Sequence, residues 1–158
     1  MAGETMALVA YNWLLSDVAA TALRALVVGA GDNIFEAGDL TEEVLVAAMG
    51  TRRTSGLSTQ VLAIAVQEGP EQPTDGYYAD QTVIVRVYDR DKGYKNIRQA
   101  VQWLIKNLKY HFADMTAGCG IGHMETYFGG RTGHRYDSRW QIDYEAVTFR
   151  CVVQYASD

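Results

Sequence analysis

The sequence is poor in the features that mark several large protein classes. It has two cysteines, Cys119 and Cys151, too few for a disulfide framework, so both are expected to be reduced thiols. No apolar run reaches the roughly 18–20 residues that span a bilayer. The start, Met1–Glu4, lacks the basic region of a signal peptide. We therefore expect a protein made and used in a cytoplasm, or in a particle assembled there.

Basic runs are also absent, because no stretch of Lys and Arg exceeds two residues in this chain of net charge −5. Sequence-specific nucleic-acid binding is therefore not expected. The charge is unevenly divided. Residues 1–80 hold three bases and eleven acids, a net of −8, whereas residues 81–158 hold eleven bases and eight acids, a net of +3. This split is either a chance distribution over solvated faces, or the mark of a subunit with one acidic and one basic surface.

Two segments carry helical periodicity. In the first, about 4–28, Leu15, Val18, Ala22 and Leu26 form an apolar stripe that Ala19 and Leu23 widen. Thr5 and Ser16 are both possible N-caps, so this segment is one long helix or two short ones. The second is the clearest helix, about 94–112, with Ile97, Val101, Leu104 and Leu108 on its apolar face.

Strand patterns occupy most of the remaining chain. Residues 61–66 are apolar on both faces, which indicates a central strand. Residues 82–88 are rich in β-branched side chains, with Val83, Val85 and Val87 on one face. Three further strands are predicted at 124–128, 136–142 and 145–155, with a hairpin at Gly129–Gly133 between the first two. Cys151 lies within the last strand and is predicted to behave as a small hydrophobe.

These elements predict one α+β domain over residues 1–158, with a mainly antiparallel sheet packed by an N-terminal helix and a central amphipathic helix. Flexible loops are predicted near 50–56, 68–78 and 113–122, the second because it contains both prolines, Pro70 and Pro73. Thr41 is a predicted N-cap for a short helix.

No pattern of residues predicts catalysis, a cofactor or a metal site. Cys119, His123 and His134, with His111 upstream, lack the second close pair of ligands that is typical of closed zinc sites. Cys119, His123 and Asp114 are neighbours in sequence without the order of a catalytic triad. Asp89 and Asp91 alternate with Arg90 and Lys92 and are interpreted as a solvated charged turn.

The half of the chain from Thr82 onward resembles a known family. Val83–Arg90, followed by Gly93 and Tyr94, a basic amphipathic helix and a long final strand, resembles the tail terminator (tail completion) subunits of long-tailed bacteriophages. The resemblance implies a non-enzymatic virion protein of the tail or neck, assembled in the host cytoplasm. It also implies a homo-oligomeric ring, commonly a hexamer, that ends tube polymerisation and forms the junction to the head connector.

The same resemblance implies three partners: further copies of the chain, the tail tube protein and the head connector. DNA would pass through the lumen without sequence-specific binding, and no membrane is involved. The predicted interface residues, most of them basic, are Arg52, Arg53, Arg86, Tyr88, Asp89, Arg90, Arg131, His134 and Arg135. Three alternatives stay open: another neck or tail ring component such as a head-closure or tube protein, a small metal- or ligand-binding domain, and a free-standing adaptor.

Overall fold

The fold is taken from a computed structural model that describes residues 5–26, 34–41, 43–44, 62–73, 78–89, 95–115, 121–140 and 142–155. Predictions at residues 50–56 and at Arg52, Arg53, Arg90, Asp91 and Cys119 lie outside these ranges. In chain order the elements are α1 Met6–Leu14, α2 Asp17–Leu26, β1 Ile34–Glu36, the 3-10 helix η1 Ala37–Asp39, β2 Ala63–Pro73, β3 Tyr78–Asp89, α4 Lys95–Met115, β4 Ile121–Arg131, β5 Arg135–Asp137 and β6 Ile142–Tyr155.

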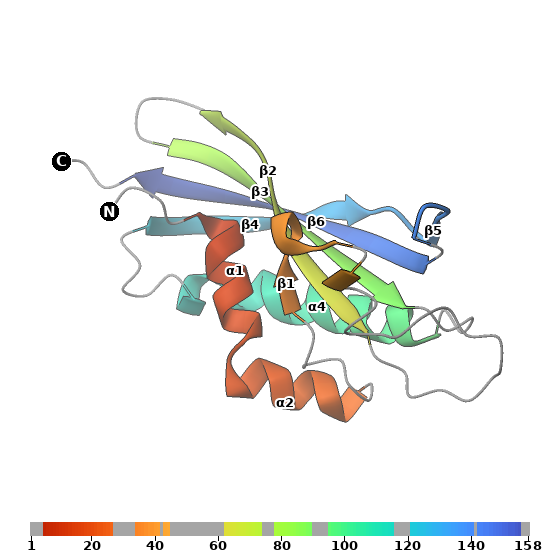
Figure 1. The fold of residues 1–158 in the computed structure, drawn as a ribbon. Helices are drawn as coiled ribbons and strands as arrows, with labels where there is room; N and C mark the ends of the chain where they lie inside the picture. Colours follow the sequence, from red (N-terminus) through yellow and green to blue (C-terminus); the bar gives the residue numbers. More distant parts are fainter. Residues whose placement is uncertain are drawn as a thin grey trace, which may run out of the picture.

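The six strands form one sheet in the order β1-β2-β3-β6-β4, with β5 also paired to β6. The β1–β2 pair is parallel, and the other pairs are antiparallel. Helices α1 and α4 pack on one face of the sheet, and α2 packs against both helices (Figure 1). The predicted α+β class with a mainly antiparallel sheet is therefore confirmed.

The N-terminal segment forms two helices. Thr5 Oγ1 accepts the N–H of Leu8 at 3.2 Å, and Ser16 Oγ accepts the N–H of Ala19 at 3.4 Å, so both predicted N-caps are used. The predicted apolar stripe is partly wrong. Ala19 and Leu23 are buried, but Leu15 and Val18 are 49% and 76% exposed. The cause is the break at Leu15 and Ser16, because a stripe drawn across it joins the faces of two differently oriented helices.

Helix α4 confirms the central prediction and extends it to Met115. Its stripe Ile97, Val101, Leu104 and Leu108 is fully buried against β3, β4 and β6. Trp103 on its flank stacks on Trp13 of α1, with ring centroids 5.7 Å apart. The predicted loop at 113–122 is therefore shorter, since residues 113–115 belong to α4 and 121–122 to β4.

Strand β2 corrects the loop predicted at 68–78. Residues 63–66 are buried on both faces between β1 and β3, as predicted, but the strand continues through Pro73, and Tyr78 already belongs to β3. The register shifts between Glu68 and Glu71, which places Pro70 in a β-bulge. Since β1 pairs only with Ile64–Val66, Pro73 lies on a sheet edge. Bulges and edges are the places where a strand tolerates proline.

The glycine-rich segment 129–133 is not the predicted hairpin. Strands β4 and β5 both pair with β6, so this segment joins two strands that follow one another along the same partner. Gly130 and Gly133 have φ of 124° and 70°, which favour glycine. The chain reverses after Asp137 instead, whose Oδ1 accepts the N–H groups of Arg139 and Trp140 at 2.9 and 3.2 Å. The predicted strand 136–142 is accordingly cut short at Asp137.

Two smaller observations complete the fold. Thr41 Oγ1 accepts the N–H of Val44 at 3.3 Å, which confirms the predicted cap; the helix predicted after it lies mostly outside the described residues. No single helix of the described ranges is long and apolar enough to cross a membrane, and α1 with the start of α2 matches that length and composition only as a pair bent by 66°.

Candidate interaction surface

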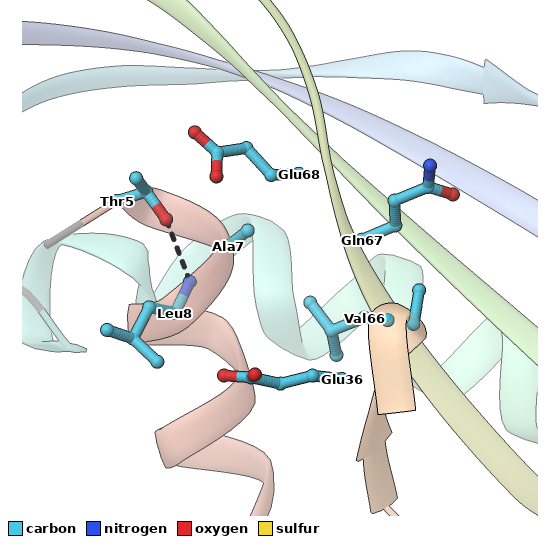
Figure 2. Close-up of a pocket in the computed structure, with 9 residues that line it drawn as sticks. Thr5, Ala7, Leu8, Glu36, Val66, Gln67 and Glu68 are labelled. Atoms are coloured by element: carbon cyan, nitrogen blue, oxygen red, sulfur yellow. Dashed lines mark hydrogen bonds between the residues drawn. The ribbon is translucent and has the colours of Figure 1, made fainter. Parts of the chain in front are cut away.

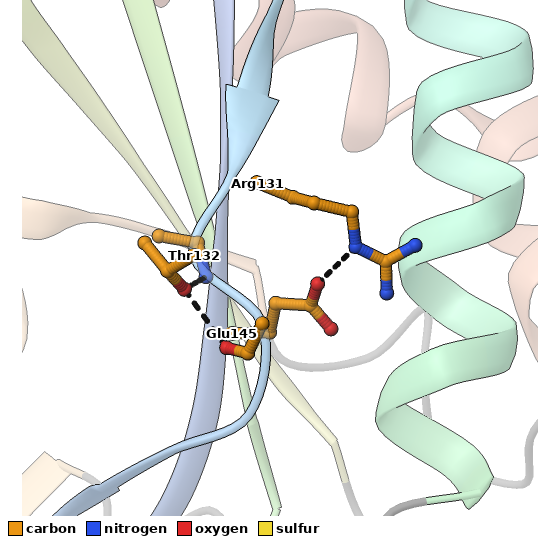
Figure 3. A network of polar contacts seen from close by, with 5 residues as sticks. Arg131, Thr132 and Glu145 are labelled. Atoms are coloured by element: carbon orange, nitrogen blue, oxygen red, sulfur yellow. Dashed lines mark hydrogen bonds and ion pairs between the residues drawn. The ribbon is translucent and has the colours of Figure 1, made fainter.

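A group of charged side chains gathers where β4 runs into β5 beside β6. Glu145 of β6 is fully buried, and Arg131 of β4 donates a hydrogen bond from Nε to its Oε1 (Figure 3). Three residues after Arg131, His134 Nε2 lies 2.8 Å from Oδ1 of Asp143, which precedes Glu145 by two positions in β6. A buried carboxylate is costly unless it is paired and hydrogen-bonded. Arg131 therefore provides the charge that allows Glu145 to be buried.

Thr132 fastens the same segment to β6 through the backbone. Its N–H donates to the carbonyl of Ala146 at 3.0 Å, and its Oγ1 accepts the N–H of Ala146 at 3.1 Å. Figure 3 shows Thr132 beside Glu145, directly after the end of β4 at Arg131. The link between β4 and β5 is thus held to β6 by two hydrogen bonds of Thr132, by the Arg131–Glu145 ion pair and by the contact between His134 and Asp143.

Asp89 corrects the prediction of a solvated turn. It is the last residue of β3, only 1% exposed, and it pairs in register with Asp143. Residues directly opposite each other in an antiparallel pair have Cβ atoms roughly 4.5–5.5 Å apart. The sheet therefore brings Asp89 close to the Asp143–His134 pair. Of the predicted interface residues, Asp89 and His134 both lie beside Asp143, and Arg131 binds Glu145 two positions further along β6.

Tyr88 and Arg135 lie in one cross-strand row on the opposite face. Tyr88 pairs in register with Tyr144, which pairs with Arg135. Tyr88 is buried against the rings of Tyr144 and Trp140, at centroid distances of 5.6 and 6.2 Å. Burial raises the pKa of the Tyr88 hydroxyl, and the nearby Arg86 guanidinium acts in the other direction. Tyr88 is therefore a buried packing residue of this face, whereas Arg135 is exposed to solvent on it.

Arg86 and Arg150 lie on this second face of the sheet, away from the helices. Arg86 donates from Nη1 to Oε1 of Gln67. Arg150 lies 3.4 Å from Asp80 and covers the Tyr127 ring at 5.4 Å from its centroid. Tyr127 remains 42% exposed beside Arg150. Arginine with exposed aromatic rings is a composition enriched at protein interfaces.

A groove lies at the other edge of the sheet, between α1, η1 and β2 (Figure 2). Its volume is ≈ 420 Å³. The residues lining it are mostly small or acidic: Thr5, Ala7, Leu8, Glu36, Ala37, Gly38, Val66, Gln67 and Glu68. Both carboxylates are exposed at this edge. Such a groove can accept a cationic side chain.

Sequence reasoning missed Glu145, Asp143, Thr132 and Arg150. The signal for Glu145 was present in the alternation of the final strand, since Glu145 shares a face with Val147, Phe149 and Cys151, which are all buried. An acid on a core-facing position requires a cation opposite it, and β4 supplies one. Nothing in the sequence alone specified that Arg131 would be that cation.

The histidines and cysteines form no metal-binding group within the described ranges, where no cluster of three or more His, Cys, Asp or Glu is placed to hold an ion. For His111 and His123 the structure describes the backbone only. Cys151 is a buried free thiol, and burial raises its pKa to about 12. The prediction that it behaves as a small hydrophobe is confirmed.

Comparison with known proteins finds likeness to solved structures, among them one from a virion. A chain in the solved virion of a native gene transfer agent particle aligns over 91% of this chain and 91% of its own length, with 14% identity and a TM-score of 0.48. No family model matches the sequence, and no curated protein matches it significantly.

Proposed function

We propose that this protein is a non-enzymatic structural subunit that forms a ring on the end of a phage-like tail tube. The observation that carries the proposal is the resemblance of residues 82–158 to tail terminator subunits, because the order of elements it implies is the order found. Strand β3 leads into α4, α4 packs on the sheet, and the long strand β6 ends the sheet. We infer that residues 1–158 act as one domain in this ring.

The mechanism follows from the rigidity of the fold. A terminator must present one surface that matches the tube and another that does not continue its polymerisation. The sheet with α1 and α4 provides a core of fixed shape, and the charged link 131–135 is held to β6 by paired side chains. Side chains held on this backbone would contact the tube. Because they are already positioned, little conformational entropy would be lost on binding. The head connector would meet the other face of the ring.

The proposed interface residues differ in their exposure and in their place on the sheet. Arg131, His134 and Arg135 are exposed at one edge, and Arg86 is half-buried on the open face. Arg52, Arg53 and Arg90 belong to the proposal from sequence alone. Another ring component of the neck or tube would use the same surfaces with a different partner, and it is the second candidate.

Assembly without this subunit separates these functions. A terminator deletion should give tails of uncontrolled length that fail to join heads. Tails of normal length that lack heads would point to a head-closure protein, and the absence of tails would point to a tube protein. Tails and heads that join normally would contradict all three.

A further inference from the structure

The sheet has two edges without a neighbouring strand among the described residues. At one edge, β1 pairs with β2 only over Ile64–Val66, so β2 from Gln67 to Pro73 has no strand on that side. At the other edge are β4 and β5, which both pair only with β6. Open edges invite association with another chain.

The first edge is acidic. Its exposed charged side chains are Glu36, Asp39, Glu43, Glu68 and Glu71, and the described residues 34–44 and 62–73 contain no Lys or Arg. Glu36 and Glu68 line the groove of ≈ 420 Å³, and Figure 2 shows both near the start of α1. Neither carboxylate has an ion-pair partner among the described residues.

The second edge is basic in its exposed side chains. Within residues 121–155 the exposed bases are Arg131, Arg135, Arg139 and Arg150, and Glu125 is the one exposed acid of the part that is described. Arg131 is engaged with Glu145, and Arg150 with Asp80. Arg135 and Arg139 have no ion-pair partner in the described part of the chain.

The two unpaired sets cannot meet within one molecule, because they lie at opposite edges of the same sheet. We propose that Arg135 and Arg139 of one copy bind Glu36 and Glu68 in the groove of the next copy. The contact is heterologous, because one copy contributes its basic edge and the next copy its acidic groove. Each copy therefore uses both edges. If the rotation from one copy to the next closes on itself, the copies form a ring. The inference rests on the proposed function, which it extends by naming the surfaces that join the subunits.

We expect this contact to consist of ion pairs between side chains. Backbone hydrogen bonds that extend the sheet from one copy to the next are not expected. Pro70 and Pro73 in the outer half of β2 have no N–H to donate, and the bulge between Glu68 and Glu71 interrupts the register. These features protect the edge from nonspecific strand addition. A charge-dependent contact is selective and weakens as salt rises, because the Debye length falls from about 8 Å at 0.15 M to about 3 Å at 1 M.

Sedimentation velocity of the purified full chain tests the proposal. The wild type should associate at low salt and dissociate toward 1 M salt. Arg135→Gln/Arg139→Gln and Glu36→Gln/Glu68→Gln should each raise the dissociation constant at least about tenfold. Lys95→Gln/Lys106→Gln on the exposed side of α4 and Asp17→Asn on α2 are the controls, and they should leave it within about twofold of wild type. Circular dichroism should show that all variants are folded.

A charge exchange gives the decisive result. Glu36→Lys/Glu68→Lys places Lys in the groove against the Arg edge, and Arg135→Glu/Arg139→Glu places Glu on the edge against the Glu groove. Each variant alone should be monomeric, and an equimolar mixture should associate, because alternating copies then match at every contact.

Three results overturn the proposal: a wild type that stays monomeric at low salt, groove and edge variants that associate like wild type, or a mixture that does not associate. Weakened binding of duplex DNA by the Arg135→Gln/Arg139→Gln variant, with unchanged mass, would assign the arginines to DNA instead. Each of these outcomes leaves the tail-length experiment unaffected. Failure of the contact is therefore distinguishable from failure of the proposed function.

Discussion

The backbone N–H of Met6 donates a hydrogen bond of 2.8 Å to Oε1 of Gln81, joining residues 75 positions apart. Met6 opens α1 and Gln81 lies in β3, and both are buried. The first N–H groups of a helix have no partner within the helix. Gln81 therefore satisfies a buried donor and fixes the start of α1 over the sheet, beside the groove.

Replacement of Gln81 should loosen α1. Gln81→Met keeps the approximate volume but leaves the Met6 N–H without this acceptor, and we expect a loss of about 1–3 kcal/mol in the free energy of unfolding. Urea unfolding followed by circular dichroism measures it. Gln102→Met, on the exposed side of α4, is the matched control and should be nearly neutral. Equal stability of the two variants would contradict the role given to Gln81.

Gly69 should tolerate no side chain. A Cβ built at this position would lie 2.8 Å from Cβ of Thr82 in β3, whereas one at Gly38 meets nothing within 4 Å. Gly69→Ala should therefore lower the free energy of unfolding by about 1–3 kcal/mol through overpacking. Gly38→Ala should change it by less than about 0.5 kcal/mol. Thermal unfolding of the two variants measures the difference. A larger loss for Gly69→Ala indicates close packing at Gly69, whereas equal small effects would contradict it.

The proline and glycine positions also show what sequence could not determine. Pro70 and Pro73 predicted a loop because the interior of a strand excludes proline, but a bulge and an edge accept it. The glycines at 129–133 predicted a hairpin, yet they join strands that share one partner. Both outcomes depend on which strands become neighbours, which is a property of the tertiary fold.

Elements with a continuous pattern were predictable. Helix α4 carries one uninterrupted stripe from Ile97 to Leu108, and β3 alternates cleanly around Val83, Val85 and Val87. The N-terminal stripe failed at Leu15 and Val18 because two helices meet there. At the candidate surface, the arginines were predictable as a type, but the pairing of Arg131 with buried Glu145 required the register of β4 on β6.

That pairing predicts an asymmetry between single and double substitutions. Arg131→Met leaves Glu145 buried without this cation and should lower the free energy of unfolding by about 1–3 kcal/mol. Arg131→Met/Glu145→Gln removes the charge as well and should recover part of that loss. Lys106→Met on the exposed side of α4 is the control and should be nearly neutral, since Lys106 is exposed and lies outside both proposed contact surfaces. A double-mutant cycle from urea unfolding measures the coupling, and strictly additive effects would contradict it.

Cys151 predicts how the folded protein responds to alkaline pH. Burial raises the pKa of its thiol from 9.0 to about 12, with a smaller opposing effect from a hydrogen bond with Thr126. Because the folded pKa lies above the unfolded one, the contribution of this group to stability is complete below pH 9.0 and is lost as the pH rises toward about 12. The folded thiol should therefore be unreactive at pH 8, because the thiolate is the nucleophile.

Thiol labelling with iodoacetamide in a Cys119→Ser variant isolates Cys151 and measures this protection. Modification at pH 8 should be negligible in the native protein and rapid in about 6 M guanidinium, with the native rate governed by unfolding. Val153→Ala, two residues away on the same buried face of β6, should destabilise the core and speed native labelling in proportion to the stability lost. Fast labelling of the native Cys119→Ser chain, with no change in circular dichroism, would show that Cys151 is accessible and would contradict the buried final strand.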